Sequence, residues 1–141
     1  MLVKQLSIFL ENKQGRFTKV ARLLGEAGIN MTAFSVADNS DFGILRLIVS
    51  EPERAFNLLK ENKFGVTLTE VVCLHCPNTP GSLAKALDIL NKEEVFIEYM
   101  YAFSMGDYAY VIIRATNIEE CVKALQKHKL ELLAADELYK L

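Results

Sequence analysis

The stretch that decides the fold reads Asn12-Lys13-Gln14-Gly15, continues from Arg16 to Gly28, and ends at Ile29-Asn30. Apolar residues at i, i+3, i+4 and i+7 give it one helical face: Phe17, Val20, Ala21 and Leu24. Gly15 precedes this helix, where a backbone without a Cβ can turn sharply and approach a ligand. The helix N-terminus adds unpaired N–H groups that suit a carboxylate. Because Gly28 ends the helix and Ile29 begins a strand, Asn30 is expected at the strand entry.

The same pattern returns in the second half of the chain as Asn78-Thr79-Pro80-Gly81 and a second helix with an apolar face, formed by Leu83, Ala86, Leu87 and Leu90. The offset that takes Gly15 to Gly81 also takes Ser50 to Thr116 and Glu53 to Glu119, and each of these segments has the hydroxyl and glutamate spacing of a capping box. A repeat of this length indicates two copies of one supersecondary unit rather than a solenoid of shorter repeats. We therefore expect one domain at residues 1–70 and a second at residues 71–141.

Each copy alternates between the period of a strand and that of a helix. In copy one the pattern predicts strands at 3–11, 29–37 and 42–49, with helices at 16–27 and after Ser50. Residues 66–76 form one extended run that also begins copy two, which continues with a helix at 82–93, strands at 95–104 and 108–115, and a helix at 117–128. A last strand begins near Leu130, although residues 132–139 also fit a helix. The expected fold class is α+β: two ferredoxin-like βαββαβ units, each an antiparallel sheet with both helices on one face.

Composition narrows the class of protein. The 141 residues are 51% apolar and carry a net charge of −2, which gives no reason to expect nucleic acid or a membrane as a partner. No apolar run approaches the roughly 20 residues of a membrane span. The N-terminus lacks the order of a signal peptide, and three cysteines are typical of reduced thiols, so we expect a cytoplasmic protein.

Motifs for catalysis or cofactor binding are not found in the sequence, and we expect neither enzymatic activity nor a cofactor. The segment Cys73-Leu74-His75-Cys76 has ligand-type residues, but in a strand Cys73 and His75 point away from Cys76. We therefore expect no metal site there. The aromatic residues Tyr99, Tyr101 and Phe103 have strand spacing and fit a core or an interface better than a base-stacking platform, because no basic groove accompanies them.

The sheet face opposite the helices is expected to be apolar in both copies. Its predicted members are Ser7, Phe9, Ile44, Arg46 and Ile48 in copy one, and Cys73, His75, Tyr110, Ile112 and Arg114 in copy two. Such a face packs better against another sheet or subunit than against water. This feature predicts a homodimer.

Two βαββαβ units, each with Asn-x-x-Gly before its first helix, resemble the ACT domains, a family of small amino-acid-sensing regulatory modules. The resemblance covers the whole chain as a tandem pair. The matching residues are Asn12, Gly15, Gly28, Ile29 and Asn30 in copy one, and Asn78, Pro80 and Gly81 in copy two. Copy two departs from the family where Glu94-Val95-Phe96 replaces Gly-Ile-Asn, which suggests one competent site and one degenerate or differently specific site.

The resemblance implies a free amino acid bound between two such domains, with loop amides and asparagine side chains holding its carboxylate and amino groups. The implied ligand-binding residues are Asn12, Gln14, Gly15, Arg16 and Asn30 in copy one, and Asn78, Pro80, Gly81 and Ser82 in copy two. A simpler interpretation also stands, in which the glycines and asparagines only form tight turns.

Three functions remain open from the sequence. The first is a non-catalytic amino-acid sensor that acts alone or on a partner enzyme. The second is a regulatory or structural subunit of an amino-acid biosynthetic enzyme, similar to the small subunit of acetolactate synthase. The third is a small enzyme, because this fold hosts many chemistries.

Overall fold

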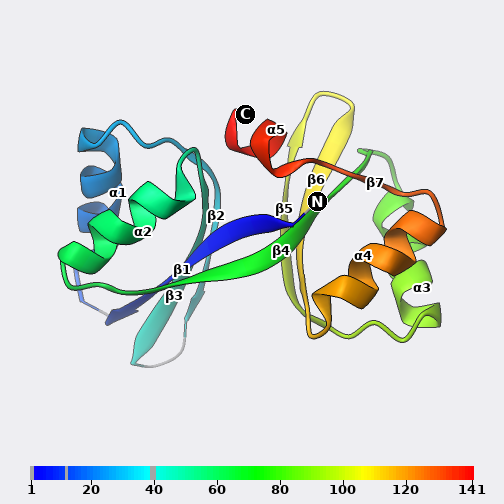
Figure 1. The fold of residues 1–141 in the computed structure, drawn as a ribbon, viewed down its shortest axis with the longest axis horizontal. Helices are drawn as coiled ribbons and strands as arrows, with labels where there is room; N and C mark the ends of the chain where they lie inside the picture. The colour runs from blue at the N-terminus through cyan, green and yellow to red at the C-terminus, as the bar shows by residue number, and fades with distance from the viewer. Residues whose placement is uncertain (1, 12, 39–40) are drawn as a thin grey trace. The chain divides into compact units, whose positions relative to one another are not determined.

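The structure, a computed structural model, describes residues 2–11, 13–38 and 41–141. Its contacts divide the chain into two units (Figure 1). The N-terminal unit comprises Lys4–Thr69 with Tyr139–Leu141, and the C-terminal unit comprises Glu70–Leu138 with Met1–Val3. Each unit therefore includes a short segment from the opposite end of the chain.

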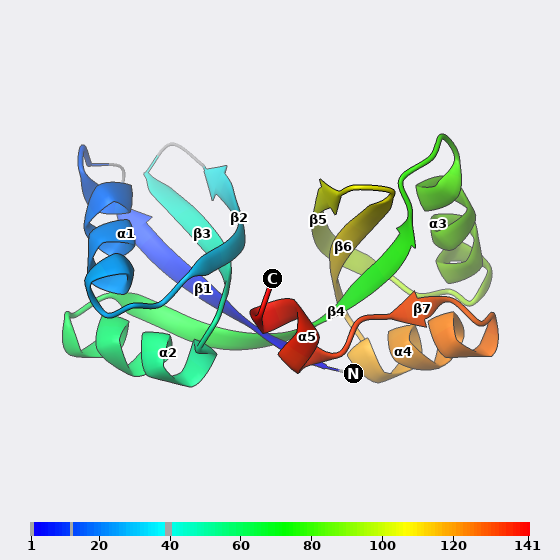
Figure 2. The same ribbon diagram turned by 90° about the horizontal axis from the view of Figure 1, so that it is seen from above.

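The N-terminal unit has the element order expected from the sequence. Its elements are β1 (Val3–Glu11), α1 (Arg16–Glu26), β2 (Met31–Asp38), β3 (Phe42–Val49), α2 (Pro52–Glu61) and the first part of β4 (Gly65–Pro77). The strands follow the order β2-β3-β1-β4, and β3 pairs antiparallel with both β1 and β2. Helices α1 and α2 cover one face of this sheet (Figure 2).

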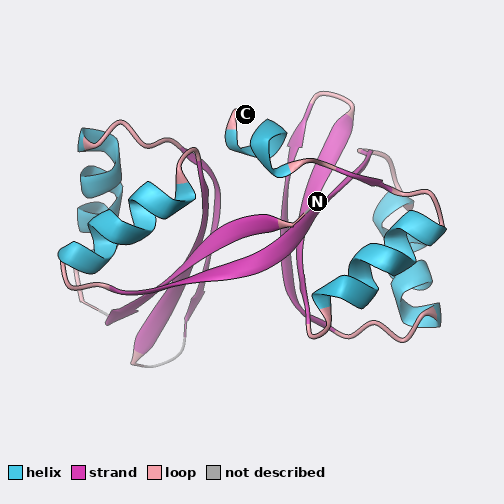
Figure 3. Cartoon of the chain, in the orientation of Figure 1, coloured by secondary structure: helices cyan, strands magenta, loops and turns pink. Residues whose placement is uncertain are grey.

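The C-terminal unit repeats this plan. It continues from β4 through α3 (Ser82–Lys92), β5 (Ile97–Met105), β6 (Tyr108–Ala115), α4 (Ile118–Lys127), β7 (Glu131–Leu132) and α5 (Ala135–Tyr139). Strand β6 pairs antiparallel with β4 and β5, and β7 pairs antiparallel with β4. Helices α3 and α4 share one face of the sheet (Figure 3). The ambiguous end of the chain contains both alternatives, a two-residue strand and then a short helix.

The core of each unit lies between its helices and its sheet. Helix α1 buries Val20 and Leu24, and α3 buries Ala86 and Leu90 at the equivalent positions of the repeat. These side chains pack against alternate residues of the strands, which include Leu6, Ile8, Leu45 and Leu47 in the N-terminal unit and Val72, Leu74, Val111 and Ile113 in the C-terminal unit. Their burial is the main stabilising term of each unit. The α+β prediction of two βαββαβ units is therefore confirmed.

The backbone follows the repeat down to its unusual dihedral angles. Positive φ values occur at Gly15 (84°) and Gly81 (87°), at Gly28 (75°) and Glu94 (58°), and at Lys63 (66°) and Lys129 (59°). Both edge strands also have an irregularity at the same place, between Met31 and Ala33 in β2 and between Ile97 and Tyr99 in β5. The two copies therefore share a backbone despite few identical residues.

The prediction of two capping boxes is wrong, because each helix has its N-cap one residue later than expected. Helix α2 has Glu51 at its N-cap, and the Ser50 hydroxyl accepts a hydrogen bond from the backbone N–H of Asn30 at 3.0 Å instead. Helix α4 has Asn117 at its N-cap, and the Asn117 side chain accepts from the Glu120 N–H at 3.1 Å. Asparagine caps helices well, and the serine hydroxyl is already used at the strand entry, so both helices begin one residue later.

The sheet face opposite the helices is only partly buried. Ser7, Ile48, Cys73 and Ile112 are each less than a tenth exposed, whereas Phe9 is 49% exposed. Exposed apolar side chains also lie elsewhere, and Phe17, expected on the apolar face of α1, is 46% exposed. The apolar stripe of α1 is thus wider than the part that the core covers.

None of the helices in the described part of the chain combines the length and the apolar character needed to cross a membrane.

Candidate functional site

The loop between β1 and α1 leaves the start of α1 open. Gly15 occupies the N-cap with φ 84°, and no side chain among the described residues caps the helix. The backbone closes locally, since Lys13 O accepts from Arg16 N–H and Gly15 O accepts from Lys19 N–H at 3.0 Å. Gln14 and Gly15 are exposed, and Asn12 lies outside the described residues. The first N–H groups of α1 can therefore receive an anionic group.

The loop between β4 and α3 has the same backbone geometry at its glycine. Gly81 is the N-cap with φ 87°, again without a side-chain cap in the part of the chain described. Asn78 N–H donates to the carbonyl of Asp107 in the β5–β6 turn at 2.8 Å. The hydroxyls of Thr79 and Ser82 lie 2.6 Å apart, and Pro80 is exposed. The hydrogen bond from Asn78 thus ties this loop to the β5–β6 turn.

Asn30 lies at the far end of α1 from Gly15. It follows the helix and precedes β2, and its backbone makes two hydrogen bonds with Ser50, one in each direction, both at 3.0 Å. The side chain of Asn30 is exposed. Because α1 has 11 residues, its two ends are about 16 Å apart at 1.5 Å per residue. Within the N-terminal unit, Asn30 and the loop at Gly15 therefore do not converge on one small ligand.

Two cations near the start of α1 share one aromatic ring. The Arg16 guanidinium carbon lies 5.0 Å from the centre of the Phe64 ring, and the Lys19 ammonium lies 5.5 Å from it. Phe64 is 5% exposed, so this ring is a fixed support. Arg16 Nε is buried and has no hydrogen-bond partner among the described residues. The sequence did not single out Phe64, and only its place in the structure, directly before β4, reveals the contact.

Lys13 is engaged with a neighbour of the opposite charge. Its ammonium lies 2.9 Å from a carboxylate oxygen of Glu11. The hydrogen bond and charge of Lys13 lower the pKa of the Glu11 carboxyl below its usual value. Both side chains are exposed, so the pair orders the loop surface only weakly.

An apolar hollow of ≈ 430 Å³ lies between α1 and the edge strand β2. It is lined by Phe17, Thr18, Ala21, Met31, Phe34, Val36 and Leu45. Phe34 and Val36 are 61% and 50% exposed. Exposed aromatic and branched side chains that border a hollow are typical of an interaction surface. Sequence reasoning missed this surface because it assigned the apolar residues of α1 to the core.

A group of rings surrounds His75 on β4. The imidazole stacks on Tyr108 at 4.3 Å between ring centres and lies 5.1 Å from Tyr110, which stacks on Phe103 at 5.0 Å. Its Nδ1 lies 3.1 Å from a carboxylate oxygen of Glu131 on β7. Of these contacts, only the one with Glu131 reaches β7, whose backbone pairs with β4 at the same residues.

Cys76 belongs to the helix-side core, whereas Cys73 does not, so the two thiols lie on opposite faces of β4. Burial raises the pKa of the Cys73 thiol to about 12. Across the described ranges, no three histidine, cysteine or acidic side chains are grouped so as to hold a metal ion.

Comparison with known proteins places these features in a family. The model of a family described as an ACT domain pair matches residues 1–141. The crystal structure of protein BT0572 from Bacteroides thetaiotaomicron is 53% identical, covers 100% of this chain and 98% of its own, and superimposes with a TM-score of 0.97.

More distant structures share the fold. The ligand-free regulatory subunit of aspartate kinase from Thermus thermophilus is 19% identical, with a TM-score of 0.64 over 89% of this chain and 92% of its own. The corresponding subunit from Thermus flavus is 18% identical, with a TM-score of 0.62 over 90% and 94%. A comparison with curated proteins gives no match.

Proposed function

Because this chain belongs to the ACT domain pair family, we propose that it is a non-catalytic regulatory protein that binds a free amino acid where two of its units meet. The observation that carries the proposal is the pair of open helix N-termini at Gly15 and Gly81. Each offers backbone N–H groups to a carboxylate, at an exposed loop with a left-handed glycine.

The chemistry of the two helix ends suits a zwitterion. The amino acid's carboxylate fits the open N–H groups, and an asparagine amide can accept from its ammonium group. Micromolar affinity needs about −8 kcal/mol, and charge-assisted hydrogen bonds contribute roughly 1.5–3 kcal/mol each. Two or three such bonds and a buried aliphatic side chain therefore suffice.

A complete site needs two units. Gly15 and Asn30 are at opposite ends of α1. A small ligand that touches a loop glycine and an asparagine of these two kinds must therefore lie between two units, with the start of the first helix of one unit facing the end of the first helix of the other. We propose that a homodimer supplies this arrangement, and that the exposed apolar side chains around the hollow at Phe17 and Phe34 belong to its interface. Ligand would then favour one arrangement of the units over another.

A second candidate keeps the same site but makes the protein a regulatory subunit of an amino-acid biosynthetic enzyme. The aspartate kinase regulatory subunit of Thermus thermophilus shares this fold, and its size is similar, since the match covers 92% of it. Co-purification with a larger catalytic subunit favours this candidate. A ligand-induced rise in the melting temperature of the isolated protein favours an independent sensor.

The test is a thermal-shift panel of the twenty amino acids followed by calorimetry on the best ligand. We expect Asn30→Ala to abolish binding without unfolding the protein. Asn57→Ala, which removes an exposed asparagine from α2 of the same unit, is the matched control and should bind normally. Unchanged affinity in Asn30→Ala would refute the role of Asn30, and a panel without any ligand would refute the sensor.

A further inference from the structure

The charged residues of α1 stand in an order that opposes the dipole of the helix. Arg16 and Lys19 lie in the first turn, where the helix is already positive, and Glu26 is the last residue, where the helix is negative. The first turn has no acidic residue, and the last turn has no basic one. Helices α2 and α4 have the favourable order, with glutamate in the first turn and lysine in the last. A charge order that costs α1 stability is typical of a surface selected for binding.

The cations of α1 contact a buried ring rather than acidic partners. The Arg16 guanidinium and the Lys19 ammonium both lie over Phe64, which orients the two side chains. Among the residues that the structure describes, no carboxylate forms an ion pair with Arg16, Lys19 or Arg22. Three positive charges on one helix are therefore left without a counter-charge from those residues.

A hollow of ≈ 500 Å³ runs along the same helix. It is lined by Gly15, Thr18, Lys19, Arg22, Leu23 and Glu26. Lys19 and Arg22 are exposed and three residues apart, so their charges lie on neighbouring turns of the helix surface. Leu23 adds an apolar side chain between them and the end of the helix. The hollow thus combines cationic and apolar groups.

The second copy of the repeat lacks this basic surface. The equivalent positions of α3 carry no net charge, since they are Ser82, Lys85 and Asp88. The contrast extends to the whole units. The N-terminal unit has ten lysines and arginines against seven acidic residues, a net charge of +3, and the C-terminal unit has six against eleven, a net charge of −5. The fold therefore does not require the cations of α1, which are a property of one copy.

We propose that the basic surface of α1, formed by Arg16, Lys19 and Arg22, binds an acidic segment of a partner protein. Charge complementarity identifies the chemistry of the partner, because carboxylates supply the counter-charges that these side chains lack. An apolar residue beside those carboxylates would contact Leu23 in the hollow. The inference goes beyond the proposed function, because it holds whether or not the chain binds an amino acid.

Nucleic acid fits this surface less well than an acidic protein segment. From Arg16 to Arg22 the helix rises about 9 Å at 1.5 Å per residue, which is short for a groove that follows a nucleic-acid backbone. Phe64 is 5% exposed, so it cannot stack on a base. The net charge of −5 on the C-terminal unit would also repel a polyphosphate chain.

Fluorescence anisotropy with a labelled octaglutamate peptide tests the proposal on the full chain. We expect Lys19→Gln and Arg22→Gln each to weaken binding about twofold to fivefold, the range that corresponds to the loss of one exposed ion pair. The double variant should weaken it about fourfold to twenty-five-fold. The matched control is the pair Lys85→Gln and Lys123→Gln, which changes the net charge equally on α3 and α4 and should stay within about twofold of the wild type.

Four results overturn the proposal. They are a wild type that does not bind the peptide at low salt, binding that the double variant retains in full, tighter binding of a short DNA duplex than of the peptide, and displacement of the peptide by inorganic phosphate at an equal concentration of charge. Circular dichroism checks that each variant is folded. Arg22→Gln, which leaves the contacts with Phe64 intact, carries the test if the loss of Lys19 disturbs the helix.

The thermal-shift panel of amino acids, repeated on the double variant, separates this inference from the proposed function. We expect the double variant to lose peptide binding and to keep any amino-acid ligand of the wild type. Loss of both ligands together overturns the inference, because it assigns Lys19 and Arg22 to the amino-acid site. Peptide binding by a wild type that responds to no amino acid overturns the sensor and supports the inference.

Discussion

Gly25 and Gly28 should respond to alanine with opposite signs. A Cβ added at Gly25 or at Gly28 meets no atom within 4 Å, so neither substitution creates a clash. Gly25 lies inside α1, whereas Gly28 follows the helix with φ 75°. Space is therefore equal at the two positions, and only the backbone conformation differs.

The magnitudes follow from that difference. Gly25→Ala removes the penalty of a helical glycine and should raise the free energy of unfolding by about 0.5–1 kcal/mol. Gly28→Ala forces an L-residue into the left-handed region, which costs about 1–2 kcal/mol, while the stiffer unfolded chain returns about 0.4–1 kcal/mol. The net loss is about 1 kcal/mol.

Urea denaturation and thermal denaturation, each followed by circular dichroism, measure both variants against the wild type. For a chain of this length the expected separation in melting temperature between the two variants is roughly 5 °C, with the wild type between them. Stabilisation by Gly28→Ala equal to that of Gly25→Ala would refute the left-handed conformation at residue 28, and with it the backbone equivalence of the two copies.

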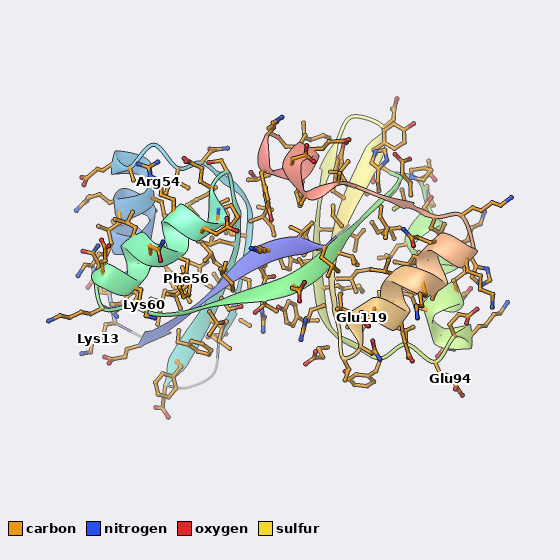
Figure 4. The ribbon with its side chains drawn as sticks, viewed as in Figure 1. Lys13, Arg54, Phe56, Lys60, Glu94 and Glu119 are labelled. Carbon is orange, nitrogen blue, oxygen red and sulfur yellow. The ribbon has the colours of Figure 1, made fainter. Side chains whose placement is uncertain are left out.

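Three further predictions concern the repeat, an ion pair and the thiols. Glu94→Gly should raise the free energy of unfolding by up to about 1 kcal/mol, because Glu94 (Figure 4) has φ 58°, a conformation that glycine adopts more easily. Glu119→Gly, inside α4, should lower the free energy of unfolding. Equal destabilisation by the two variants in denaturant titrations would contradict this prediction. The Lys4 ammonium donates a hydrogen bond to the Glu53 carboxylate at 2.6 Å and lowers the pKa of that carboxyl below its ordinary 4.5. The pair therefore stabilises the fold above pH 4.5, and its contribution is lost as the pH falls further. Glu53→Gln should accordingly flatten the acid side of a plot of denaturation midpoint against pH, and an unchanged slope would argue against the contact. Burial raises the pKa of Cys73, so Ellman's reagent at pH 8 should react slowly with the native protein and fully after denaturation; rapid labelling of the native protein would show that the thiols are accessible.

The sequence predicts the order of elements well because hydrophobic periods and the repeat reinforce each other. Val20 and Leu24 have helical spacing and are buried, and the equivalent residues of copy two, Ala86 and Leu90, are buried in α3. Helix starts were harder to predict. Serine is a common N-cap residue, but the Ser50 hydroxyl instead accepts a hydrogen bond from the backbone N–H of Asn30, 20 residues away in the chain. A pattern of neighbouring residues cannot predict such a contact.

The candidate site was harder to predict than the fold for a geometric reason. Along the chain, Gly15 and Asn30 belong to one motif, and the sequence therefore predicted that both contact the same ligand. The intervening helix separates them by about 16 Å. Only the three-dimensional structure shows that residues at the two ends of α1 cannot hold one small ligand within a single unit. Phe17 illustrates the same limit, because an apolar residue at helical spacing can lie in the core or at its edge, and here it is 46% exposed.

The divergence of the two copies follows from what each position has to do. Residues 28 and 94 both adopt a left-handed backbone, although one is glycine and the other glutamate. In both copies the next residue donates its N–H back to the helix, Ile29 to Leu24 and Val95 to Leu90, each at 2.9 Å. Two residues further along, the carbonyl groups of residues 30 and 96 accept hydrogen bonds from the backbone N–H groups of Ser50 and Thr116, both at 3.0 Å. The main chain is thus retained while the side chain changes from Asn30 to Phe96, which is 70% exposed. The exposed side chain at this position therefore differs between the copies without a change in the main chain. Under the proposed function, a site at residue 30 would be polar and a site at residue 96 would be aromatic, so the two copies would accept different ligand groups.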